Sequence, residues 1–214
     1  NLARVGLARV KMDLKKWAEA ATAAALVPAA YEKLGDRGGE TDRRWNKMFF
    51  FFTDGGFFTV ATALRNNPDP RYKVIDTGHG AFTPQIRLFV TEKYPALNTP
   101  IRLASYREAQ LILAEAKAQQ GDAVGALAIL NARRAEISLA PLVATTGPEA
   151  VTAVIGERQA ELAFEGGQRM NDLLRYHLPW KGANGSTKIA NEFDGRPYGA
   201  TVCWPIPTKE VNGA

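Results

Sequence analysis

The chain has 214 residues, of which 46% are hydrophobic and 23% charged, as expected for one sizeable globular domain or a compact pair. No apolar run is long enough to span a bilayer, which excludes a membrane-spanning helix. The net charge of +5 comes from lysines and arginines scattered among 22 acidic residues. Nucleic-acid binding requires a clustered basic stripe, so the sequence argues against that class of partner.

The chain begins at Asn1, without a methionine, a signal peptide or a lipid-accepting N-terminal cysteine. We therefore expect any targeting segment to lie outside it. One cysteine, Cys203, excludes an internal disulfide framework and a cysteine-rich metal site. It lies between Val202 and Trp204, which favours a buried, inert thiol over a nucleophile.

Residues 2–12 are helix-periodic, residues 17–27 are rich in alanine, and Pro28 follows them. This pattern predicts a first helical hairpin. Ala8 and Ala20 are twelve residues apart, as are Ala114 and Ala126 later in the chain. Small residues at that spacing resemble the close helix contact of the tetratricopeptide repeat.

Residues 28–100 are rich in glycine and proline and contain many of the aromatic residues. Short strands are predicted at 48–53, 57–61 and 87–91, and the sequence NNPDP at 66–70 predicts a turn. A long irregular stretch in a helical protein is either a functional loop system or poorly ordered.

The stretch 102–134 predicts a second hairpin, around which the rest of the chain is organised. Its apolar periodicity is carried by Tyr106, Ala109, Leu113 and Ala116, and then by Ala126, Leu127 and Leu130. Gly121 is expected to end the first helix in a left-handed conformation, and Asp122 to cap the second. The two helices should be antiparallel and close together.

Residues 138–148 read as a linker, 149–165 as a further helix, and Gly166-Gly167 as a break before a last helical segment at 169–176. A short closing strand is predicted at 201–206. The expected fold class is mainly α, with tetratricopeptide-like helical hairpins, a long irregular loop-rich insertion and short strands.

Enzyme motifs are missing from the sequence. His79 and His177 have no metal-ligand spacing, the serines lie in no nucleophile elbow, and Gly78-His79-Gly80 is typical of a turn. We expect no catalytic residue, no metal and no cofactor. A glycosidase remains open on sequence grounds, because its two carboxylates need no motif.

Glu157, Glu161 and Glu165 are four residues apart and form one row on the predicted helix. Like charges at that spacing repel unless cations neutralise them, and Arg158, Arg169 and Arg175 are the nearest candidates. We favour a structural ion-pair network over a catalytic acid cluster. The predicted network consists of Glu157, Arg158, Glu161, Glu165, Arg169, Asp172 and Arg175.

Aromatic residues in predicted loops are the remaining functional signal, because rings stack on the apolar faces of sugars. Core packing is the alternative explanation for each of them. The predicted ligand-binding residues are Trp45, Phe57, Phe82, Tyr94 and Trp180.

Three motifs in order resemble the C-terminal half of the SusD/RagB family. They are RLASYREAQLILAEA at 102–116, ERQAELAFEGGQRMNDLLR at 157–175, and WPIPTKE at 204–210. The second has one glycine more than the family pattern. Asp69-Pro70-Arg71 also resembles a D-P-R that precedes a long loop in the family. The resemblance covers about residues 66–212.

The resemblance implies a nutrient-binding lipoprotein of the bacterial outer membrane, on its cell-surface or periplasmic face. It would capture glycans, or peptides in some branches, without catalysis, and would act as a lid on a SusC-like TonB-dependent transporter. A lipid anchor would lie upstream of this chain.

Family members are usually more than twice this length. We therefore expect 1–214 to be a single SusD/RagB-like domain that lacks an N-terminal portion. Within it, 1–28 would be the first helical hairpin, 29–100 the loop-rich segment and 101–214 the C-terminal helical part. The hairpins would face the transporter while the loops present aromatic rings. The rival hypothesis is a helical-repeat scaffold or accessory subunit that has lost ligand capture.

Overall fold

The computed structural model describes residues 1–39, 43–179, 185–186, 197 and 199–200. Trp180, Cys203 and the strand predicted at 201–206 lie outside the described residues. The helices are α1 (Leu2–Asp13), α2 (Trp17–Ala25), α3 (Lys47–Phe49), α4 (Tyr106–Gln119), α5 (Ala123–Glu136), α6 (Gly147–Glu161) and α7 (Gln168–Arg175). The strands are β1 (Glu32–Gly35), β2 (Val74–Gly80), β3 (Arg87–Thr91) and β4 (Ile101–Ser105).

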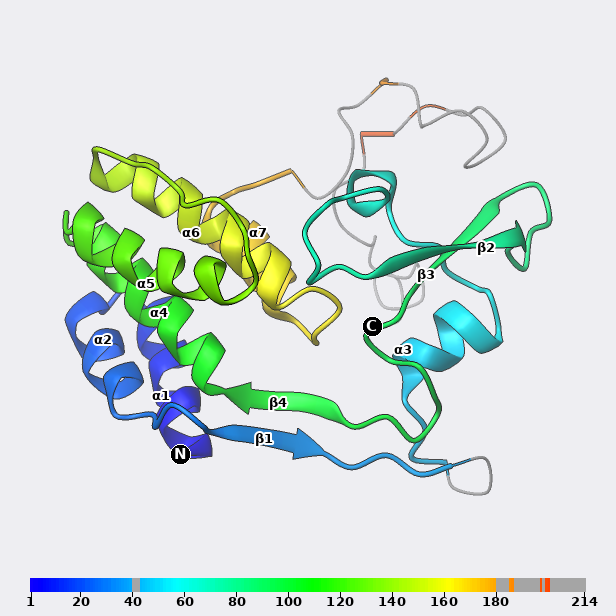
Figure 1. Ribbon diagram of the computed structural model, residues 1–214, viewed down its shortest axis with the longest axis horizontal. Coiled ribbons are helices and arrows are strands. Elements are labelled where there is room, and N and C mark those ends of the chain that lie inside the picture. The colour runs from blue at the N-terminus through cyan, green and yellow to red at the C-terminus, as the bar shows by residue number, and fades with distance from the viewer. Residues whose placement is uncertain (40–42, 180–184, 187–196, 198, 201–214) are drawn as a thin grey trace, which may run out of the picture.

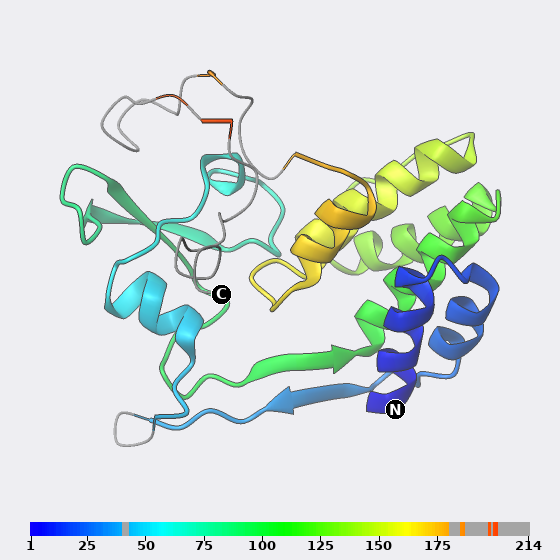
Figure 2. The same cartoon turned by 180° about the vertical axis from the view of Figure 1, so that it is seen from behind.

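The molecule has a helical part and a loop-rich part (Figure 1). Both views show α1, α2, α4, α5, α6 and α7 gathered at one end, and β2, β3 and α3 at the other (Figures 1 and 2). The antiparallel pair β1–β4 extends from the helices toward the loops. The described part is therefore rich in helix with a few short strands, as predicted.

Helix α4 is the centre of the helical part, since α1, α2, α5 and α6 all pack against it. Ala109 and Ile112 contact the α1–α2 hairpin, while Leu111, Ala114 and Ala118 contact α5 and α6. The small side chains on both sides let neighbouring backbones approach closely. The four alanines with the repeat-like spacing are fully buried, but their assignment to a tetratricopeptide repeat stays a prediction.

The turn between α4 and α5 follows the sequence signals. Gly121 has a φ of +86°, and Asp122 Oδ1 accepts a hydrogen bond of 2.8 Å from the backbone N–H of Gly125. Only Arg102 to Ser105 differ from the expected helical stretch, because they belong to β4. Ser105 then caps α4 by accepting from the N–H of Glu108 at 3.2 Å.

Helix α6 begins two residues earlier than predicted and ends four residues earlier. Thr146 and Glu149 form a capping box at its start, with Pro148 in the first turn. At the other end Leu162 no longer has helical backbone angles, and α7 begins after Gly167.

The predictions for the loop-rich part were partly wrong. The strand predicted at 87–91 is present as β3, whereas residues 48–53 lie in α3 and in the π-helical segment Phe50–Asp54 that continues it. Residues 57–61 belong to no helix or strand, although the N–H of Val60 donates to the carbonyl of Phe89 at 2.9 Å. Gly78-His79-Gly80 ends β2 at an irregularity in its pairing with β3, and is not a separate turn.

In the part of the chain that the structure describes, we find no helix with the length and apolar character needed to cross a membrane.

Candidate functional site

Asn46 holds the aromatic loop at its base. Its side chain is fully buried and accepts hydrogen bonds from the N–H groups of Met48 (2.9 Å) and Phe49 (3.1 Å). The same side chain donates to the carbonyl of Thr99 at 2.8 Å, and the Asn46 N–H donates to Leu97 at 2.7 Å. The start of α3 is thereby fixed to a segment about fifty residues away in the sequence.

A π-helical turn and a left-handed glycine bring two distant phenylalanines together. The N–H groups of Phe57 and Phe58 both donate to the carbonyl of Phe51, at 2.9 and 3.1 Å, so the chain folds back on itself. Gly56 has a φ of +57°, and its carbonyl accepts from the N–H of Phe82 at 2.8 Å. The ring of Phe82 consequently stacks on that of Phe57, with centroids 5.2 Å apart and an interplanar angle of 30°.

These rings form an exposed apolar patch on the loop-rich part. Phe57 is 48% exposed, Phe58 54% and Phe82 73%, and Phe51 joins them with its centroid 6.1 Å from that of Phe57. We call Phe51, Phe57, Phe58 and Phe82 the aromatic surface. A hollow of about 340 Å³ is lined by Phe57, Phe58 and Phe82, and also by Ile86 and Arg65.

The described lining of the hollow is mostly apolar and aromatic. Its described lining contains no carboxylate, histidine or cysteine. Among the lining residues that the structure describes, Arg65 is the charged one. Its side chain donates a 2.7 Å hydrogen bond to the Val60 carbonyl and lies over the Phe89 ring, 4.3 Å from the centroid. Flat apolar rings beside a fixed cation can contact a ligand but cannot move a proton.

Trp45 and Tyr94, also predicted to bind ligand, do not line this hollow. Trp45 is half-buried, and the ammonium of Lys47 covers its ring at 4.8 Å from the centroid. Tyr94 is only 3% exposed, and its hydroxyl donates to the Phe164 carbonyl at 3.3 Å, so its assignment to a ligand surface was wrong. Burial also raises the pKa of Tyr94 to about 12. Trp180 lies outside the described residues.

Sequence reasoning missed Phe51 and Phe58. The signal available was the run of four phenylalanines at 49–52, which was interpreted as a strand. In a strand, alternate rings would point to opposite faces, whereas the π-helical turn places Phe50 and Phe51 next to each other, with centroids 5.3 Å apart.

Replacing Gly56 by alanine should disturb the aromatic surface selectively. A φ of +57° is unfavourable for any residue with a Cβ, and the added methyl would meet the backbone nitrogen of Phe82 at 3.4 Å. We expect Gly56→Ala to lower the free energy of unfolding by about 1–2 kcal/mol in urea denaturation. Gly6→Ala is the matched control, because Gly6 lies in α1 and a methyl group added there would meet no heavy atom within 4 Å. A variant as stable as the Gly6 control would contradict the proposed strain.

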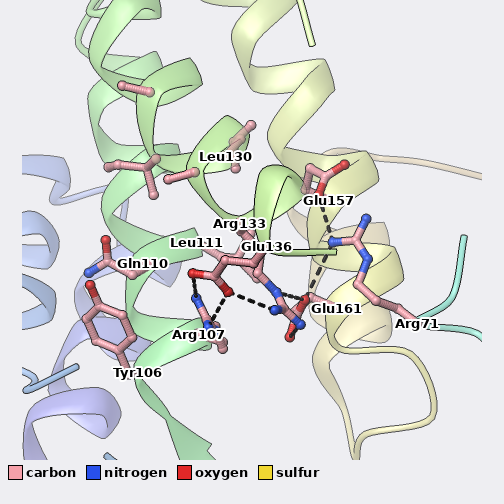
Figure 3. A pocket seen from close by; sticks show the side chains of 13 residues that line it. Arg71, Tyr106, Arg107, Gln110, Leu111, Leu130, Arg133, Glu136, Glu157 and Glu161 are labelled. Atoms are coloured by element: carbon pink, nitrogen blue, oxygen red, sulfur yellow. Dashed lines mark hydrogen bonds and ion pairs between the residues drawn. The ribbon is translucent and has the colours of Figure 1, made fainter. Parts of the chain in front are cut away.

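The acidic row on α6 lies away from the aromatic surface and is neutralised by cations from other elements. Glu157 pairs with Arg71 at 2.7 Å and with Arg134, while Glu161 pairs with Arg133 at 2.9 Å. Figure 3 shows Arg71 and Arg133 approaching these two glutamates from different sides. Glu165, which lies beyond the end of α6, pairs with Lys93 at 2.8 Å and Arg102 at 2.9 Å.

The predicted partners of this row were therefore wrong. Arg158 points to the other side of α6, where its Nε lies 3.0 Å from Asp172 and 3.5 Å from Glu115. Arg175 joins this second group through Glu115 and through Asp172 at 2.7 Å. No ion pair involves Arg169 within the described residues. Two separate networks thus tie α6 to α4, α5, α7 and the loop at Arg71.

A pocket of about 330 Å³ lies beside the first network, between α4 and α5 (Figure 3). Its apolar floor includes Leu111 and Leu130, and at its edge Arg107 and Arg133 both bind Glu136. The carboxylates around it are paired with guanidinium groups, so none is placed as a free acid or base. Among the described residues there is also no group of three histidine, cysteine or acidic side chains that could hold a metal ion.

Comparisons with known proteins agree with this architecture. The sequence profile of the SusD family matches residues 65–213. No protein with a curated description matches the chain.

Three solved structures share the fold. A SusD-like protein from Bacteroides fragilis is 17% identical with a TM-score of 0.60, and the match covers 82% of this chain and 54% of that one. A SusD superfamily protein from Parabacteroides distasonis is 15% identical with a TM-score of 0.56, covering 92% and 54%. A SusD superfamily protein from Bacteroides vulgatus is 15% identical with a TM-score of 0.54, covering 83% and 51%. The chain thus spans about half the length of these structures.

The profile match covers more than half of the chain, and it includes the loop at Arg71, the α4–α5 hairpin and α6 with its ion pairs. The chain belongs to the SusD family.

Proposed function

We propose that this chain is a non-catalytic, glycan-binding component of nutrient uptake at the bacterial outer membrane. The observation that supports this most directly is the aromatic surface, where Phe57 and Phe82 stack and remain about half and three-quarters exposed. Monomeric proteins rarely leave such rings together in water unless they contact something else. Pyranose rings have apolar C–H faces that match a flat pair of aromatic rings.

Membership of the SusD family supports the wider setting of the proposal. The partner would be a SusC-like TonB-dependent transporter, and the protein would lie on the cell-surface or periplasmic face of the outer membrane, held by a lipid anchor outside this chain. The helical part would face the transporter. The loop-rich part, which carries the aromatic surface at the other end of the molecule, would then face the ligand (Figure 1).

The arrangement of acids supports binding over glycoside hydrolysis. A glycosidase needs one carboxyl group that can donate a proton and a second that reaches the sugar. Glu157 and Glu161 are the adjacent pair on α6, but both are nearly buried and both contact Arg71. Neither lines the hollow at the aromatic surface.

Removing two rings tests the proposal. We expect Phe57→Ala/Phe82→Ala to lower the affinity for the bound polysaccharide by about tenfold or more, because central aromatic contacts carry most of the energy of such sites. Affinity gel electrophoresis against a panel of neutral and charged polysaccharides would identify the ligand and measure the loss.

The control removes exposed apolar groups elsewhere. Val124 and Val143 are more than four-fifths exposed and lie in α5 and the linker, so Val124→Ala/Val143→Ala should bind like the wild type. Failure of the wild type to bind every glycan and peptide tested would contradict the proposal. Purification of the native protein in a complex without a TonB-dependent transporter would then favour a helical scaffold or accessory subunit.

A further inference from the structure

A second concave region lies beside the aromatic surface and is strongly basic. It is a cleft of about 680 Å³ between β4, the start of α3, and the loop that joins α6 to α7. We call it the basic cleft. Its lining includes six cationic side chains and one acidic side chain, Glu165. The six are Arg9, Arg37, Arg43, Arg44, Lys47 and Arg102.

The cations in the inner part of the cleft are neutralised by the protein itself. Arg9 forms a two-bond pair with the buried Glu108 and also donates to the Leu103 carbonyl at 2.6 Å. Arg102 donates to Glu32 at 2.7 Å and to Glu165 at 2.9 Å. These two residues shape the wall, and their charge is already compensated.

The cations at the mouth of the cleft are different. No carboxylate among the described residues lies within ion-pair distance of Arg37, Arg43 or Lys47. Arg43 and Lys47 are exposed, and Arg37 is half-buried with a hydrogen bond of 3.0 Å to its neighbour's carbonyl. Lys47 is held in place by the rings of Trp45 and Phe50, whose centroids lie 4.8 and 5.2 Å from its ammonium nitrogen. A positive charge that has no carboxylate partner among the described residues can attract an anionic group from solution.

The cleft and the aromatic surface are joined by one ring. The centroid of Phe50 lies 5.3 Å from that of Trp45 in the cleft and 6.3 Å from that of Phe57 on the aromatic surface. An extended ligand that contacts the exposed rings can therefore continue toward Lys47 and Arg43. A chain of sugar rings with acidic substituents fits both regions, since its apolar faces meet the phenylalanines and its charges meet the cations.

We infer that the ligand is an anionic polysaccharide, whose carboxylate or sulfate groups bind Arg43 and Lys47 in the basic cleft. The inference rests on the function proposed above and adds the charge of the ligand to it. Trp45 was predicted to bind the ligand itself, but in this inference its ring positions Lys47.

Paired polymers with the same backbone test the inference. Polygalacturonate and its fully methyl-esterified form differ in carboxylate charge, and dextran sulfate and dextran differ in sulfate. We expect the wild type to bind at least one acidic polymer about tenfold more tightly than its neutral counterpart, and to lose that preference as NaCl rises from about 50 to about 500 mM. The two pairs separate carboxylate from sulfate recognition.

The variant Arg43→Gln/Lys47→Gln should lower the affinity for the acidic polymer about tenfold and leave the affinity for the neutral polymer unchanged. The matched control is Lys15→Gln/Lys73→Gln, which removes the same charge from two exposed lysines outside the cleft and should bind like the wild type. Equal effects of both double variants would show that net charge alone is responsible, and would overturn the assignment to the cleft.

Three further outcomes are decisive. If acidic and neutral polymers bind equally well and Phe57→Ala/Phe82→Ala abolishes both, the inference of an anionic ligand would be wrong. The glycan-binding function would still stand. If poly-L-glutamate binds as tightly as either acidic polysaccharide, the inference of a saccharide ligand would be wrong and an acidic peptide would be favoured. No binding to any polymer would overturn both proposals.

Discussion

Arg71→Met should lower the free energy of unfolding by about 3–5 kcal/mol, because it removes the cation that binds Asp69 and one of the cations that bind Glu157, which keeps Arg134, in a nearly buried position. The Arg71 side chain is 7% exposed and donates to both oxygens of Asp69 as well as to Glu157 at 2.7 Å. Burial opposes its charge, but these partners outweigh burial and raise the pKa of Arg71. Methionine keeps most of the aliphatic length of arginine, so the decrease in the free energy of unfolding would measure the lost charge interactions.

The loss should depend on pH in a defined direction. Burial alone would raise the pKa of Asp69, but the hydrogen bonds from Arg71 outweigh it and lower that pKa below its usual value. In the wild type, Asp69 therefore contributes stability above about pH 4, and this contribution disappears as the pH falls below that range. In the variant, burial without the cation should raise the pKa, so the variant gains stability as the pH falls. The difference between the two proteins should consequently be largest near pH 7 and shrink toward pH 4 in urea denaturation.

Arg87→Met is the matched control, because Arg87 forms a similar pair with Asp76 at 2.7 Å in which both side chains are about half exposed. Exposed pairs of this kind contribute little to stability, so the control should have the same free energy of unfolding as the wild type. Adding Asp69→Asn to Arg71→Met should restore part of the lost free energy of unfolding, since it removes the carboxylate that no longer receives hydrogen bonds from Arg71. A loss in Arg71→Met that matches the control at every pH would contradict this account.

Asn46→Ala should lower the free energy of unfolding by about 2–4 kcal/mol and weaken ligand binding as well. It removes the cap of α3 and leaves the carbonyl of Thr99 without its 2.8 Å donor in a partly buried position. The π-helical turn that carries Phe51 begins directly after α3, so a loosened cap should also loosen the aromatic surface. Urea denaturation and affinity electrophoresis on the same variant would measure the two effects.

Asn67→Ala makes the same change at an exposed turn, where the Asn67 side chain accepts a single hydrogen bond of 3.0 Å from the N–H of Asp69. We expect a loss below about 1 kcal/mol there and unchanged ligand affinity. If Asn46→Ala unfolds like this control, the side chain of Asn46 is not what fixes the aromatic loop.

The helical part was predictable because its signals are local. Gly121 and Asp122 are adjacent in the sequence, and the conformation of one and the side chain of the other suffice to end α4 and begin α5. The start of α6 carries a comparable signal in Thr146 and Glu149, although the prediction placed it two residues late. Motifs of this kind need no knowledge of the rest of the fold.

The loop-rich part was mispredicted where distant segments decide the structure. The four phenylalanines at 49–52 favour a strand on propensity alone, but Asn46 bonds to Leu97 and Thr99 and starts a helix in front of them. The ion pairs show the same limit, because Arg71 and Arg133 are far from Glu161 in sequence and could not be identified from spacing. Predicting the aromatic surface as a whole required knowing that Phe82 lies on Phe57.

The pairing of β1 with β4 has a consequence for how this chain can tolerate insertions. Glu32 lies opposite Ser105, and Gly35 opposite Ile101, so the chain leaves the helices and returns to them at neighbouring points. Lengthening a loop whose ends are already held together costs little additional entropy. Apart from the stretches around Arg71 and Lys93, which form ion pairs with Glu157 and Glu165, the loops between these strands can therefore be lengthened or shortened while α4 keeps its neighbours.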